Sequence, residues 1–96
     1  DKLKDDLAVI AAVRRAVGDD VQLMCDFNQG LAFGEALLRL HALDDQGLSW
    51  FEEPIVYDNL EGCAQIAREM KTPVQIGENI YGPREFLKAV KAGAAD

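Results

Sequence analysis

Three carboxylates stand at the ends of short apolar runs, at a regular spacing along the chain. Asp26 lies in "CDFNQ", Glu52 in "FEEP" and Glu78 in "GEN". Carboxylate oxygens are the ligands that hard divalent ions prefer, Mg²⁺ before Ca²⁺ or Mn²⁺. Three anions that lie close together repel one another strongly unless a cation sits among them. The three residues are therefore candidate ligands of one Mg²⁺, provided that the fold brings them together.

The elements that must position these acids are strands that alternate with helices. Apolar runs bounded by turn residues predict strands at 21–27, 48–53 and 73–77. Helical spacing of apolar residues predicts helices that end at Gly18, Gly47, about Met70 and Gly93. This alternation indicates an α/β fold with about three βα units and parallel strands. Two architectures fit it: a small doubly wound sheet, or part of a (β/α)8 TIM barrel, which needs roughly 250 residues when complete.

Alternation of side chains along each strand predicts which face the acids share. Each acid has the same parity as the apolar residues before it, so the acids and an apolar inner face should point the same way. The apolar residues of that face are Met24, Trp50, Val74 and Ile76. The carboxyl ends of strands are also where barrels and open α/β sheets place their active sites. Glu53 has the opposite parity, and we expect it to point toward the helices and pair with a base or a backbone N–H.

Composition narrows the class of protein. The 96 residues have room for one small domain, and 49% of them are hydrophobic. Ten Lys and Arg against 17 Asp and Glu give a net charge of −7, which argues against a nucleic-acid partner. No segment has the apolar length of a membrane span. Cys25 and Cys63 lack zinc-like spacing, which indicates reduced thiols in a cytoplasmic protein.

The motifs together resemble the enolase superfamily, in its mandelate racemase and muconate-lactonizing branch. The similarity is carried by "DLAVIAAVRRAVGDD" (6–20), "MCDFNQG", "WFEEP" and "IGENIYGP", in this order and spacing. It covers nearly the whole chain. The resemblance implies that residues 1–96 are a central fragment of a (β/α)8 barrel domain, without the N-terminal capping domain and the remaining barrel strands.

The resemblance also implies a chemistry and a role for each matching residue. Asp26, Glu52 and Glu78 would ligate an essential Mg²⁺, and Asn28 would contact the substrate. The family removes the proton α to a carboxylate, with the metal stabilising the charge that develops. A lyase (dehydratase) or isomerase (racemase) acting on a small hydroxy acid or sugar acid is therefore expected. The parent protein is expected to be a homo-oligomer.

The general acid and base of the family are expected outside this chain. The Lys-x-Lys base would fall upstream of Asp1, so Lys2 and Lys4 are interpreted as a solvated helix end. Asp96 comes a few residues too early to be the family's Asp of an Asp–His pair. His41 lies in mid-helix and is interpreted as a boundary residue. The chain alone is therefore expected to have no turnover.

Two other classes of protein remain open from the sequence. One is a stand-alone acidic α/β module of the phospho-receiver type, which also gathers acids at strand ends around Mg²⁺. Such a module normally has adjacent acids on its first strand and a lysine at the end of its last, and neither is present here. The other is a non-catalytic excised or designed half-barrel, which would share all the residues discussed.

Overall fold

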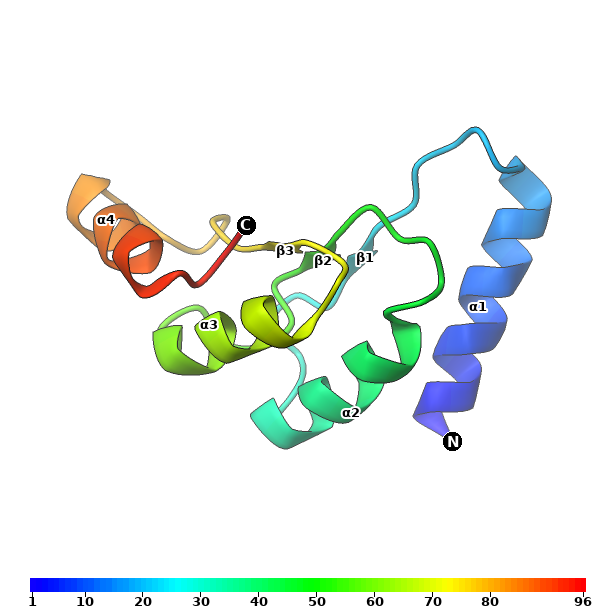
Figure 1. The fold of residues 1–96 in the computed structure, drawn as a ribbon, viewed down its shortest axis with the longest axis horizontal. Helices are drawn as coiled ribbons and strands as arrows, with labels where there is room; N and C mark the ends of the chain where they lie inside the picture. The colour runs from blue at the N-terminus through cyan, green and yellow to red at the C-terminus, as the bar shows by residue number, and fades with distance from the viewer.

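Helices and strands alternate along the whole chain in the computed structural model, which describes residues 1–96 (Figure 1). The seven elements are α1 (Lys2–Val17), β1 (Cys25–Asp26), α2 (Phe33–Leu43), β2 (Phe51–Glu52), α3 (Leu60–Glu69), β3 (Val74–Gln75) and α4 (Pro83–Ala92). None of the helices is long and apolar enough to cross a bilayer. The predicted α/β order is confirmed.

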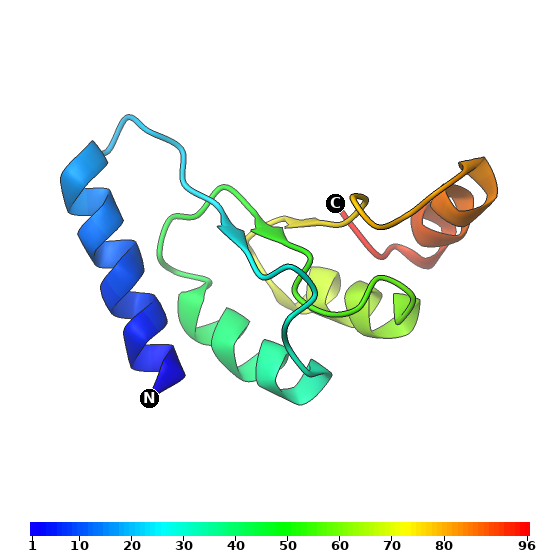
Figure 2. The same ribbon diagram turned by 180° about the vertical axis from the view of Figure 1, so that it is seen from behind.

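The three strands form one parallel sheet in the order β1–β2–β3. In both ribbon views α2 and α3 lie on one face of the sheet, and the opposite face carries no helix (Figures 1 and 2). Helix α1 lies beyond the β1 edge of the sheet, and α4 lies beyond the β3 edge. Phe51 and Val74 are paired in register and fully buried, on the helix side of the sheet. They form the core together with Leu40, Leu43 and Ile66.

The regular strands are shorter than predicted, with two residues each in place of 21–27, 48–53 and 73–77. Backbone hydrogen bonds between the first two segments continue past the strand, from Gln29 N to Glu53 O at 2.7 Å. The extended geometry stops because φ turns positive at Asn28 (47°), Gln29 (62°) and Glu53 (43°). The carboxyl ends of the strands are therefore turns tied to one another rather than continuous strand.

The predicted helix ends at Gly18, about Met70 and Gly93 are confirmed. Asn59 caps α3 by accepting a hydrogen bond from Gly62 N at 3.0 Å. Pro83 occupies the first turn of α4, and Gly93 ends it in the left-handed region with φ 68°. The second helix ends at Leu43, four residues before the predicted stop at Gly47. The side chain of the next residue, Asp44, accepts hydrogen bonds from Lys71 N and Thr72 N in the next βα unit.

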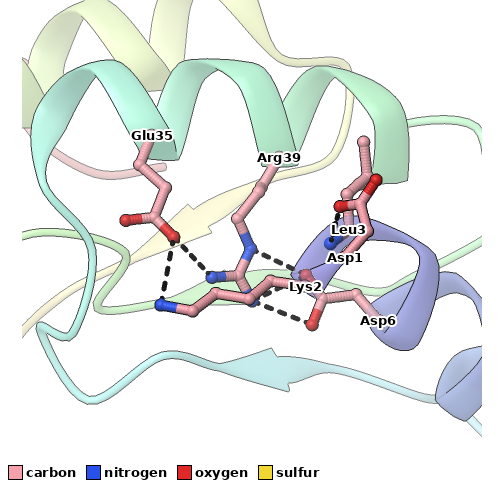
Figure 3. A network of polar contacts seen from close by, with 6 residues as sticks. All are labelled: Asp1, Lys2, Leu3, Asp6, Glu35 and Arg39. Atoms are coloured by element: carbon pink, nitrogen blue, oxygen red, sulfur yellow. Dashed lines mark hydrogen bonds and ion pairs between the residues drawn. The ribbon is translucent and has the colours of Figure 1, made fainter.

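Arg39 of α2 joins α1 to the rest of the fold (Figure 3). Its guanidinium donates two hydrogen bonds to the Asp6 carboxylate, at 2.7 and 2.8 Å, and one to Glu35 at 2.9 Å. It also lies 5.8 Å from the ring centroid of Phe27. A two-pronged contact of this kind fixes direction as well as distance, so it sets the angle at which α1 lies against α2.

Candidate metal centre

Asp26, Glu52 and Glu78 come together at the carboxyl ends of the strands, as predicted. One carboxylate oxygen from each lies within 4.8 Å of the other two. Asp26 and Glu78 are exposed, while Glu52 is partly buried. No other group of three His, Cys, Asp or Glu side chains in the chain has this geometry.

The pairing of β1 with β2 explains how two of the acids meet. Asp26 and Glu52 are direct partners in the parallel register, so their side chains leave the same face of the sheet. That face is the one without helices (Figure 2). The predicted alternation is therefore correct for these two strands.

The alternation predicted for the third strand is wrong. Glu52 is paired with Gln75, so it is Gln75, and not Val74, that shares the face of the acids. Val74 is fully buried on the helix side and does not belong to an apolar inner face. Simple alternation would turn Glu78 toward the helices as well. Gly77, with φ 151°, breaks that alternation and lets the Glu78 carboxylate reach the cluster.

Two of the three carboxylates are oriented by a hydrogen bond to one of their oxygens. Asn28 N donates to Asp26 Oδ1 at 2.8 Å, and Trp50 Nε1 donates to Glu52 Oε2 at 3.0 Å. The second oxygen of each of these two carboxylates accepts no hydrogen bond from the protein. Partners of this kind fix the direction of a ligand before the ion arrives.

The donor set fits a small hard cation. An octahedral Mg²⁺ with oxygens at about 2.1 Å holds its ligand atoms at most about 4.2 Å apart. Oxygens within 4.8 Å of one another therefore need only a small further approach. Three carboxylates, two at strand ends and one in the turn after β3, also leave coordination positions open for water or a bidentate ligand.

Cys25 adds no soft ligand to this cluster. It is the register partner of Phe51, so its side chain leaves the helix side of the sheet. Burial, followed by the charge of Asp6, raises the pKa of the Cys25 thiol. A thiol with a raised pKa stays protonated at neutral pH and is a poor metal ligand. The centre is therefore an all-oxygen site.

Glu53 lies outside the cluster, as expected, and pairs with a backbone N–H. Its side chain is 1% exposed. It accepts hydrogen bonds from the backbone N of Asn79 at 3.3 Å and from the Asn79 side-chain amide at 2.9 and 3.0 Å. No Lys, Arg or His forms an ion pair with it. The contact between Asn79 and Glu53 was not predicted from the sequence. The one sequence feature that points to Asn79 is its position next to Glu78.

The other residues considered from the sequence lie apart from this cluster. His41 is exposed on α2, with its Nε2 3.9 Å from Glu69, and Lys2 and Lys4 are exposed in the first turn of α1. At the start of β3, Asp96 N donates to Val74 O and the Asp96 carboxylate accepts from Val74 N, both at 2.8 Å. The interpretation of these residues as structural is consistent with their positions. Asn28 is exposed next to Asp26, and its contact with a substrate remains a prediction.

Fold and site together are typical of (β/α)8 barrel enzymes, whose active sites lie at the carboxyl ends of parallel strands. Here that position carries a cluster of three carboxylates that could bind a metal ion. The family described as enolase C-terminal domain-like matches residues 1–96. The chain belongs to this family.

Relatives of known structure have the same fold over almost the whole chain. An enolase from the alpha proteobacterium bal199, solved with bound magnesium, is 53% identical, with a TM-score of 0.95 over 98% of this chain and 26% of that one. An enolase from Bradyrhizobium, complexed with magnesium and mandelic acid, is 44% identical, with a TM-score of 0.93 over 98% and 26%. Magnesium as the family's cofactor is thereby confirmed, and the receiver-type alternative is not supported.

Curated relatives are enzymes with related chemistry. D-galactarolactone cycloisomerase of Agrobacterium fabrum is 39% identical over 98% of this chain and 25% of its own length. Others include racemases, an epimerase and dehydratases. The chain therefore spans about a quarter of the length of the relatives that it matches.

Proposed function

We propose that this chain is the metal-binding segment of a Mg²⁺-dependent enzyme that removes the proton α to a carboxylate. The observation that carries the proposal is the convergence of Asp26, Glu52 and Glu78 within 4.8 Å at the carboxyl ends of three parallel strands. The parent protein would be a complete (β/α)8 barrel enzyme, a lyase or an isomerase. Its general acid and base would come from outside residues 1–96.

The residues at the acidic cluster would have separate parts in this function. Asp26, Glu52 and Glu78 would hold the ion, while Asn28 N and Trp50 Nε1 keep two of the carboxylates oriented. Bound Mg²⁺ would supply Lewis-acid stabilisation of the charge that develops on the substrate carboxylate. Asn28, at the turn after Asp26, would contact the substrate beside the ion.

The substrate class is a small hydroxy acid or sugar acid. Relatives named for galactarolactone, arabinonate and talarate or galactarate support a sugar acid. The relative solved with mandelic acid supports a simple hydroxy acid. The two free thiols, Cys25 and Cys63, are consistent with a cytoplasmic location.

The test is exchange of the α-proton in D₂O, followed by NMR, with the full-length protein, Mg²⁺ and a panel of hydroxy and sugar acids. We expect Mg²⁺-dependent exchange or turnover with at least one member of the panel. Asp26→Asn should abolish it, and His41→Gln, which alters an exposed helix residue, should leave it unchanged. Exchange that survives Asp26→Asn, or that needs no Mg²⁺, would contradict the proposal.

A further inference from the structure

Glu53 has a buried carboxylate, and Asn79 is the only residue whose side chain donates hydrogen bonds to it. Its side chain is 1% exposed and forms no ion pair, although a buried carboxylate is costly unless it is hydrogen-bonded. Three contacts with the backbone N and side-chain amide of Asn79 supply those bonds, at 2.9 to 3.3 Å. The two residues come from different βα units, so the contact must serve to join the segments that carry them.

The two segments are those that carry two of the three clustered acids. Glu53 follows Glu52 directly, and Asn79 follows Glu78 directly. A fixed distance between Glu53 and Asn79 therefore limits how far Glu52 and Glu78 can move apart.

The backbone of Glu53 extends the same linkage to both neighbouring segments. Its carbonyl accepts from Gln29 N at 2.7 Å, in the turn after Asp26, and its N–H donates to Gln75 O at 2.9 Å. Its φ of 43° is unusual for a residue other than glycine. One residue in a strained conformation, on the segment that carries Glu52, thus contacts both of the other segments that bear the acids.

We propose that Glu53 and Asn79 are a positioning pair for the metal centre, which holds Glu52 and Glu78 at binding distance before the ion arrives. This inference rests on the proposed function. Without an ion the three carboxylates repel one another, and those of Asp26 and Glu78 are exposed. The pair opposes that repulsion with hydrogen bonds that are shielded from water, so the ion does not have to gather its own ligands.

The experiment measures metal affinity and metal-free stability separately in the full-length protein. Mn²⁺ binding is followed by the EPR signal of the free ion, and thermal unfolding is recorded in EDTA. The variants are Glu53→Gln, Asn79→Ala and the double substitution. The matched control is Asp44→Asn, which weakens a polar contact between two βα units at the other end of the strands.

We expect Glu53→Gln and Asn79→Ala each to weaken Mn²⁺ binding about 10- to 100-fold, the usual effect of losing a residue that orients metal ligands. The double substitution should be little worse than the more severe single one, because either change breaks the same contact. Asp44→Asn should lower the Tm with no change in affinity.

Two results would overturn the inference, and they are distinguishable from failure of the proposed function. If Glu53→Gln and Asn79→Ala lower the Tm but keep the affinity within about twofold of the unmodified protein, the pair is only structural. If the losses in affinity are fully additive, the two residues do not act through their contact. If the unmodified protein does not bind Mn²⁺, or if the Asp26→Asn variant binds it equally well, the proposed metal site itself is wrong.

Discussion

Electrostatic repulsion acts among the carboxylates of Asp26, Glu52 and Glu78. Two like charges about 4 Å apart cost about 1 kcal/mol in a water-like environment, and more where water is excluded. The cluster therefore lowers the stability of the metal-free protein, and binding of a divalent ion reverses that effect. Acids that serve binding at the expense of stability are expected at a functional site.

Removing one of these charges should separate binding from stability. Asp26→Asn keeps the shape of the side chain and should raise the free energy of unfolding of the metal-free protein by up to about 1 kcal/mol. The same change should remove the stabilisation that Mg²⁺ gives to the unmodified protein. Thermal unfolding with and without Mg²⁺ measures both effects. A variant that is less stable without metal, or that is still stabilised by Mg²⁺, would contradict this account of the cluster.

At the level of elements, Asp44 connects the end of α2 to the turn before β3. Its carboxylate accepts hydrogen bonds from Lys71 N at 2.8 Å and Thr72 N at 2.7 Å, and its backbone carbonyl accepts from the Thr72 hydroxyl at 3.2 Å. Burial alone would raise the pKa of Asp44, but the hydrogen bonds from Lys71 and Thr72 outweigh it, so the pKa is lowered. The contact lies at the end of the strands opposite to the acidic cluster, so it concerns stability.

Because the pKa of Asp44 is lowered in the folded protein, the stability that this contact contributes depends on pH. A carboxyl group whose pKa is lower in the folded state stabilises the fold fully above its ordinary pKa of about 3.9, and the contribution is lost as the pH falls through the folded-state value. Asp44→Asn should therefore lower the Tm at pH 7 by an amount that shrinks below about pH 4. Unfolding curves of both proteins between pH 7 and pH 3 test this. A difference in Tm that stays constant over that range would show that the charge of Asp44 is not what stabilises the contact.

The order of elements was predictable from the sequence because it depends on local patterns. Helical periodicity and the glycine stops at Gly18 and Gly93 act within a few residues. The register of β3 was not predictable, because it depends on which residue faces Phe51 across the sheet. Alternation counted from Val74 gave the correct acid for the wrong reason, since the positive φ at Gly77 is what redirects Glu78. Asn79 was missed because its partner, Glu53, is close only in the folded chain.

At the scale of the whole molecule, both outer strands lie beside unfilled apolar space. A cavity of about 500 Å³ lies between α1 and β1, and one of about 190 Å³ lies beside β3 and α4. Val9 on α1 is 61% exposed, and Val90 on α4 is 74% exposed. Solved relatives are about four times longer than the match. The proposal that this chain is part of a complete barrel therefore predicts that further βα units cover both regions.

The 96-residue chain by itself should therefore self-associate or be poorly stable, because open strand edges and apolar patches drive association. Light scattering over a range of concentrations, together with thermal unfolding, tests this. We expect an apparent mass that increases with concentration, or a broad transition without cooperativity. A monomer that does not depend on concentration and melts cooperatively would contradict the proposal that these residues belong to a larger barrel domain.

The proposed function requires that Asp26, Glu52 and Glu78 bind one ion. The most direct measurement is a crystal structure of the full-length protein grown with Mn²⁺, in which anomalous scattering locates the metal. We expect a single strong peak within bonding distance of one oxygen from each of the three carboxylates, with Glu53 still bonded to Asn79 and not to the ion. A peak at another position, or one that contacts Glu53 in place of any of the three, would contradict it.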